Sequence, residues 1–185
     1  MRKLLNTLYS VSTAMAACCL ITIASLVILH VFGRLIDGTR KAFGFEPIGL
    51  QIPSLGEFAG FLLVGASFLA LAGTLRLGDH IRVTILLQAV SDKTARLLNV
   101  WCLGVAFVLA GFFTWNAGLL AYDSHLYHEV SVGIIPVPLV YPQAIMTFGL
   151  FVFSISLLDD LVTTALGNAP SFESLGDKDL IEGRE

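Results

Sequence analysis

Four histidines, His30, His80, His125 and His128, are the side chains in this sequence best suited to bind a metal ion or haem. A haem held in a helical bundle needs axial ligands that face each other, and other metal sites need a complete set of ligands. His125 and His128 would share one side only if their segment is helical. The three cysteines are odd in number and lack CxxC spacing, so they complete no such set. We therefore predict no metal site and no cofactor, and a membrane anchor for a haem- or quinone-linked redox complex is the alternative.

Sequence motifs for catalysis are missing as well. The sequence has no GxxxxGK[ST] phosphate-binding loop and no GxSxG nucleophile elbow. Four long apolar stretches carry no Asp, Glu, Lys or Arg at their centres, where a proton relay or an ion path would leave one. The sequence therefore predicts no catalytic residues, and the chain alone does not resemble a complete pump or carrier.

The composition indicates a membrane protein. The chain of 185 residues is 56% hydrophobic and 14% charged, with a mean hydropathy of +0.82, whereas soluble domains are about 25% charged. A bilayer core about 30 Å thick requires roughly 20 apolar residues of helix. The four stretches therefore predict an all-α integral membrane protein with four transmembrane helices, at about 8–36, 57–77, 97–122 and 138–162.

The connections and the tail differ in polarity from these helices. Residues 37–56 mix charged residues, glycine and proline with several large apolar side chains, so we expect an interfacial segment along the bilayer surface. An ordinary loop with a few anchoring aromatics is the alternative. We expect residues 1–162 to form a four-helix membrane domain and residues 163–185 an acidic cytoplasmic tail, because seven acidic and two basic residues follow Leu158.

The distribution of basic residues predicts the orientation of the chain. Lys and Arg in short loops tend to remain in the cytoplasm. With the N-terminus inside, the inner segments carry eight of these residues and the outer segments three. We therefore predict a multi-pass protein with both termini in the cytoplasm. The acidic tail offers no basic surface to nucleic acid.

Small residues recur at helical spacing along the apolar stretches. Such residues let helix backbones approach closely in lipid, where no hydrophobic force drives helices together. They could serve packing within the chain or packing on another protein. The candidate helix-packing residues are Gly56, Gly60, Ala66, Ala70, Gly73, Ala106 and Ala110.

A short motif follows the second apolar stretch, in "ALAGTLRLGDHIRVTILL". Its distinctive residues are Arg76, Gly78, His80, Ile81, Arg82 and Val83. The motif, four spans, a glutamate that opens the second span (Glu57), and "SVGIIPVPLVYPQAIMTFGL" resemble the DctQ-like small membrane subunit of tripartite ATP-independent periplasmic (TRAP) transporters. The resemblance covers about residues 8–162. The sequence departs from the family at Thr84, where an aspartate is common.

The resemblance implies partners and a function. In such systems a large membrane subunit transports the substrate with sodium, and a periplasmic substrate-binding protein captures it. The small subunit would lie among membrane lipids in the bacterial cytoplasmic (inner) membrane. It would be a scaffold for the large subunit in organic-acid uptake by secondary transport, and its outer loops would help dock the binding protein. His80 and Arg82 would contact headgroups and hold the cytoplasmic hairpin.

Overall fold

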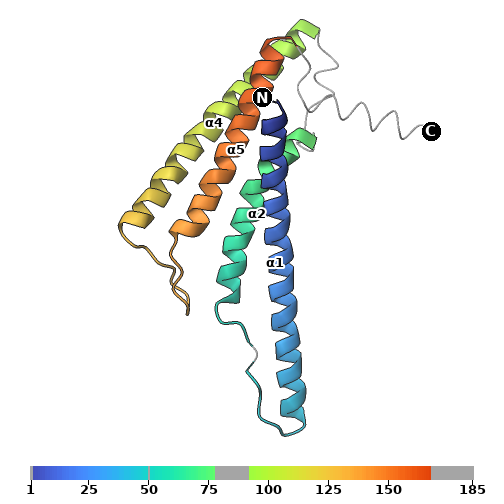
Figure 1. Ribbon diagram of the computed structural model, residues 1–185, viewed down its shortest axis with the longest axis vertical. Coiled ribbons are helices and arrows are strands. Elements are labelled where there is room, and N and C mark those ends of the chain that lie inside the picture. Colours follow the sequence, from blue (N-terminus) through green and yellow to red (C-terminus); the bar gives the residue numbers. More distant parts are fainter. Residues whose placement is uncertain (1, 50, 78–91, 168–185) are drawn as a thin grey trace, which may run out of the picture.

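The computed structural model describes residues 2–49, 51–77 and 92–167, and within these ranges the regular structure is helical apart from one isolated bridge. The helices are α1 (Arg2–Ala42), α2 (Leu55–Leu77), α4 (Asp92–Leu126) and α5 (Val140–Ala165). All four are long and apolar enough to cross a membrane. The prediction of an all-α protein with four transmembrane helices is confirmed (Figure 1).

Most of the helices extend beyond the predicted span limits. α1 continues to Ala42, past the limit near residue 36, and α4 begins at Asp92 and ends at Leu126. These additions contain charged or polar residues, which helices tolerate outside the hydrocarbon region. The predicted limits mark where the chain leaves the hydrocarbon core, and a helix can continue beyond that point.

The helices form a single row rather than a closed bundle. α4 packs on α5, α5 packs on α2, and α2 packs on α1, whereas α1 barely touches α5. Figure 1 shows the same order across the molecule, viewed along its shortest dimension. α1 and α4 are therefore the two flanks of the row, and α2 and α5 are its centre.

The two central helices are in close backbone contact. A Cβ atom added to Gly149 of α5 would lie 2.6 Å from the carbonyl carbon of Phe68 in α2. Beside this point, Val152 is completely buried and Leu69 is 1% exposed. Only glycine permits this approach, because any side chain at position 149 would meet the main chain of α2.

The contact between α1 and α2 combines small residues with a polar bond. The Ser12 hydroxyl is buried and donates a hydrogen bond to the Leu69 carbonyl at 2.7 Å. Gly73 lies against the Thr13 side chain, and Gly65 lies near Cys19. These contacts fix the register of the antiparallel pair.

α4 and α5 share an apolar cluster. Leu103 and Ala110 of α4 pack with Leu157 of α5 and Leu75 of α2. The Thr114 and Ser154 hydroxyl groups lie 3.1 Å apart, which joins α4 to α5 by a hydrogen bond. Each hydroxyl also lies within hydrogen-bonding distance of the carbonyl one turn earlier in its own helix. Since each has one proton, one hydroxyl donates to the other while the second donates to its own helix, an arrangement that satisfies hydroxyls inside a membrane.

The C-terminal end of α1 extends beyond the first residues of α2. Arg76 lies at the level of Asn6, Gly65 at that of Cys19, and Ile52, just before α2, bonds to His30. The residues after His30 therefore have no α2 residues beside them. Residues 43–49 and 51–54 of the connector return along this end of α1 (Figure 1).

Asp37 holds the connector against α1. Its buried carboxylate accepts hydrogen bonds from the amides of Ile48 at 2.7 Å and Gly49 at 3.2 Å. The backbone of Gly49 has a φ of 76°, in the left-handed region that glycine adopts without strain. On the other side of the connector, the Arg40 guanidinium donates to the Glu46 carbonyl at 2.9 Å. The predicted interfacial segment is thus a tethered connector after the last turns of α1.

Candidate functional site

Arg76 is the member of the predicted motif that the structure describes; Gly78, His80, Ile81, Arg82 and Val83 lie outside the described residues. It occupies the last turn of α2. Its guanidinium forms an ion pair with Asp159 of α5 at 3.4 Å, hydrogen-bonds to Asn6 of α1, and lies 4.4 Å from the centre of the Tyr9 ring. Arg76 therefore connects α1, α2 and α5 on the side of the molecule where α1 begins and α2 ends.

The surroundings of Arg76 combine charge with burial. The Arg76 and Asp159 side chains are 23% and 27% exposed, and Tyr9 is 3% exposed. Asp160, the next residue of α5, is buried as well. Partly exposed ion pairs contribute only about 1 kcal/mol or less, so the main effect of Arg76 here is to fix the positions of three helix ends.

The predicted helix-packing residues fall into two groups. Ala66, Gly73 and Ala110 are buried between helices, while Ala70 and Ala106 are partly buried. Gly56 and Gly60 are exposed, and a Cβ atom added to either would meet nothing within 4 Å. The surface along Gly56 and Gly60 is therefore available to a second protein or to lipid.

Exposed positions continue along the same side of α2. Leu63 and Ser67 follow Gly60 at intervals of three and four residues, and both are exposed. Residues at this spacing lie on one face of a helix. We name this surface, Gly56, Gly60, Leu63 and Ser67, the open face of α2.

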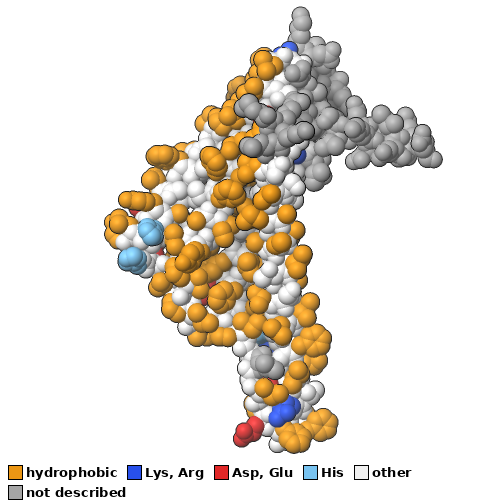
Figure 2. Space-filling model, in the orientation of Figure 1, with side chains coloured by type: hydrophobic (Ala, Val, Ile, Leu, Met, Phe, Trp, Pro, Cys, Tyr) orange, Lys and Arg blue, Asp and Glu red, His pale blue; other side chains and the backbone are white. Residues whose placement is uncertain are grey.

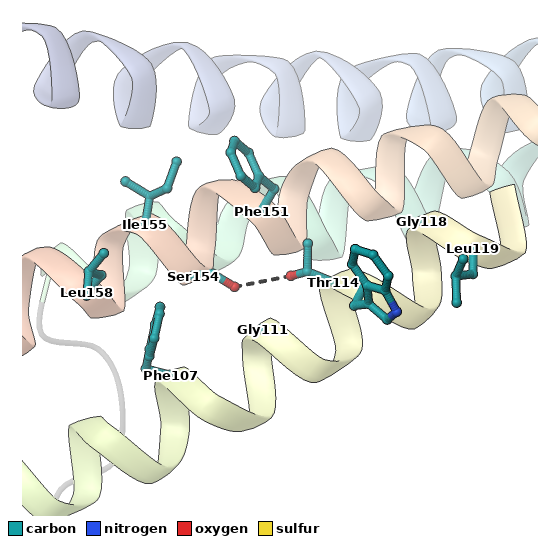
Figure 3. A pocket seen from close by; sticks show the side chains of 10 residues that line it. Phe107, Gly111, Thr114, Gly118, Leu119, Phe151, Ser154, Ile155 and Leu158 are labelled. Carbon is teal, nitrogen blue, oxygen red and sulfur yellow. Dashed lines mark hydrogen bonds between the residues drawn. The ribbon is translucent and has the colours of Figure 1, made fainter. Parts of the chain in front are cut away.

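A groove of about 520 Å³ runs between α4 and α5. Figure 3 shows the hydrogen-bonded pair Thr114 and Ser154 in its floor, with Phe107 and Phe151 among the side chains around it. Gly111 and Gly118 of α4 have no side chains, which leaves space for the groove on that side. Since both floor hydroxyls are satisfied within the chain, the groove presents a surface suited to hydrocarbon, either of a lipid or of an apolar helix.

Large apolar side chains cover the flank formed by α4. At alternating intervals of three and four residues, one stripe of this helix is exposed: Trp101, Val105, Val108, Phe112, Trp115, Leu119 and Tyr122. Figure 2 shows hydrophobic side chains over most of the visible face, with charged groups near the far end of α1. Such a surface requires lipid or another membrane protein as its surroundings.

The histidines are dispersed among the described residues. His30 accepts a hydrogen bond from the Ile52 amide at 3.3 Å, next to the connector. His125 lies in the last turn of α4 and His128 just after the helix. Both are on the opposite flank of the row from His30, which belongs to α1. Within residues 2–49, 51–77 and 92–167, no three His, Cys, Asp or Glu side chains are grouped to hold a metal ion. The arrangement offers no support for the haem-anchor alternative.

Several structural residues were not identified from the sequence. Gly149 and Ser12 form close interhelical contacts, and Asp160 is buried near Arg76. A glycine within the fourth apolar stretch was a visible signal for Gly149. Ser12 and Asp160 carry no local signal, because their burial depends on helices distant in the sequence.

Glu57 and the outer loop also meet. The Glu57 carboxylate lies in contact with Gly133, in the loop between α4 and α5. In the same region the Ile135 amide donates to the Ser54 hydroxyl at 3.3 Å. The glutamate that opens α2 thus marks the contact of α2 with this loop.

Comparison with known protein families matches residues 39–167 to the family described as tripartite ATP-independent periplasmic transporters, DctQ component. The match contains α2, α4 and α5 with their connections and begins near the end of α1. Comparisons with curated proteins and with solved structures gave no match. The resemblance found in the sequence is confirmed: the chain belongs to the DctQ family and is a small membrane component of a TRAP transporter.

Proposed function

We propose that this chain is the non-catalytic scaffold of a sodium-coupled TRAP transporter for organic acids. It packs beside the large transport subunit in the bacterial inner membrane and has both termini in the cytoplasm. Its outer segments help dock the periplasmic substrate-binding protein. The family match identifies a TRAP transporter component, and the role of the chain as a scaffold goes beyond that match.

The open row of helices is the observation that carries this proposal. A carrier encloses its substrate between helices and alternates access to it. Here the flanking helices α1 and α4 each pack mainly on one central helix, and the described spans place no group of three or more His, Cys, Asp or Glu side chains between them. A single layer of helices can support a moving partner, but it provides no enclosed path for a polar solute.

The open face of α2 is a suitable surface for the large subunit. Gly56 and Gly60 permit close approach of a second backbone, and Ser67 adds a hydroxyl near the middle of the helix. Helices in membranes associate through such small and polar residues. We assign this face to a transmembrane helix of the large subunit.

The loop between α4 and α5 is a suitable surface for the binding protein. Val132 and Ile134 are among its most exposed side chains, at 104% and 81%. The Ser131 amide and hydroxyl bond to Val137, which closes the loop on itself. A constrained loop with apolar side chains at its tip can bind a protein without a large entropic cost.

Reconstituted uptake tests the scaffold role. Proteoliposomes would contain this chain alone, the large subunit alone, or both, each with the binding protein, a sodium gradient and a panel of labelled dicarboxylates, keto acids and sugar acids. We expect accumulation with both membrane subunits and none with this chain alone. Sodium-driven accumulation by the isolated chain would refute the scaffold role.

Gly60→Leu tests the contact assigned to the open face of α2. The substitution meets empty space within the chain, so the free energy of unfolding of the isolated protein should remain within about 1 kcal/mol of the parent value. Co-purification with the large subunit should fall at least tenfold, because the leucine separates the two backbones. Full recovery of the complex would show that another face makes this contact.

A further inference from the structure

A second groove, of about 460 Å³, lies between the first turns of α1 and the last turns of α2. It is separate from the groove between α4 and α5. Asn6 and Arg76 lie at one end, with Tyr9 and Ser10 about one turn further along α1, and Thr13, Ala14, Ala17 and Gly73 form the remainder. The groove therefore changes from polar to apolar along its length.

The length of this gradient matches one leaflet of a membrane. From Asn6 to Ala17 the α1 helix advances about 16 Å at 1.5 Å per residue, which is close to half of a hydrocarbon core about 30 Å thick. Arg76 lies in the last turn of α2, where long basic side chains reach the headgroup region. The polar end thus lies at headgroup depth, and the apolar end lies toward the bilayer centre.

The polar groups in the groove retain hydrogen-bonding capacity. A guanidinium has five N–H groups, and Arg76 bonds to Asn6 in the groove and to Asp159 on the α5 side. The exposed Ser10 hydroxyl donates no hydrogen bond to any part of the chain that the structure describes. By contrast, the Thr13 hydroxyl donates to the Tyr9 carbonyl at 3.0 Å. Arg76 and Ser10 are therefore the groups that remain to bind a ligand.

We propose that this groove binds one glycerophospholipid of the leaflet on the side where α1 begins. The phosphate accepts hydrogen bonds from Arg76, and an ester oxygen accepts one from Ser10. One acyl chain lies over the exposed Ala14 and Ala17, where small side chains leave room for it. Phosphate is a strong acceptor for the Arg76 N–H groups that Asn6 and Asp159 do not use, and the polar-to-apolar gradient matches a single lipid better than a uniformly apolar helix.

Native mass spectrometry of the full chain tests this assignment. The detergent-solubilised protein would be titrated with a phosphatidylglycerol, with diacylglycerol of the same acyl chains, and with inorganic phosphate. We expect one phospholipid per chain to persist, with at least tenfold weaker binding of diacylglycerol and no retained phosphate. Diacylglycerol binding as tight as that of the phospholipid would overturn the assignment of a phosphate site.

Two alanines of α1 provide a matched pair of variants. Ala17→Phe should fill the apolar end and weaken phospholipid binding at least tenfold, whereas Ala24→Phe, on the same side of α1 but two turns deeper, should leave it unchanged. Circular dichroism melting of both variants controls for folding, and Ser10→Ala should weaken binding about threefold without any change in melting. Equal losses for both phenylalanines would indicate nonspecific annular lipid, and unchanged lipid binding by Ala17→Phe with loss of the large subunit would assign the groove to that protein. Either result refutes the lipid site.

Discussion

The centre and the flanks of the helix row are both strongly apolar but differ in burial. In the most apolar part of each helix, 39% of the α5 residues and 33% of the α2 residues are buried within the chain, against 11% for α4 and 6% for α1. The central helices place glycines in contacts, at Gly65, Gly73 and Gly149, whereas Gly104 and Gly111 of α4 face open space. Hydropathy identifies a span, but the surroundings of its small residues decide whether it forms the centre of the protein or a surface for partners.

Gly149→Ala is expected to give the largest loss of stability. Its added Cβ atom would lie under 3 Å from three backbone atoms of α2, so the central helices must move apart. Overpacking of this kind costs typically 1–3 kcal/mol, and contact with rigid main chain places this case near about 3 kcal/mol. Unfolding in mixed detergent micelles measures the free energy.

Gly104→Ala is the matched control on the flank. It adds the same methyl group to a transmembrane helix where nothing lies within 4 Å, and replacing a helical glycine gains about 0.5–1 kcal/mol. The variant should therefore be at least as stable as the parent. Equal destabilisation by the two alanines would show that centre and flank do not differ in packing.

Asp37→Ala is expected to have an intermediate, local effect on the α1 flank. The carboxylate holds the Ile48 and Gly49 amides, and hydrogen bonds to a charged group are worth about 1.5–3 kcal/mol, less beside an exposed connector. Hydrogen exchange of these two amides should accelerate about tenfold, while amides of α5 keep their protection. Asp37→Asn retains one acceptor oxygen, so the Ile48 and Gly49 amides should exchange faster than in the parent and more slowly than in Asp37→Ala. Faster exchange throughout α5 would contradict a local role.

Ser154→Ala should cause the smallest change, although it removes a hydrogen bond between central α5 and flank α4. Polar bonds between membrane helices average about 0.6 kcal/mol, and the Thr114 hydroxyl keeps its bond to the Ala110 carbonyl at 2.7 Å. A double-mutant cycle with Thr114→Val isolates the contribution of the pair. A coupling above about 2 kcal/mol would make this bond a principal support of the row.

The sequence was sufficient for the four helices and the family because each depends on local pattern. Long charge-free stretches define spans, and Arg76 with its neighbours forms a compact motif. The side of each helix that packs was not predictable: Gly56 and Gly60 have the GxxxG spacing yet face outward, while Gly149, with no paired glycine, contacts α2. Such contacts join residues distant in the chain, and a single sequence contains no direct record of them.

The length of α1 has a consequence for its place in the bilayer. Its 41 residues extend about 62 Å, twice the thickness of a hydrocarbon core. Steep tilting would shorten its projection, but the antiparallel contact with the 23-residue α2 ties the two inclinations together. Hydrophobic mismatch therefore cannot be relieved by α1 alone. The apolar turns around Phe32 and Leu35, which are 58% and 61% exposed, must draw the local membrane outward or shelter against a neighbouring subunit.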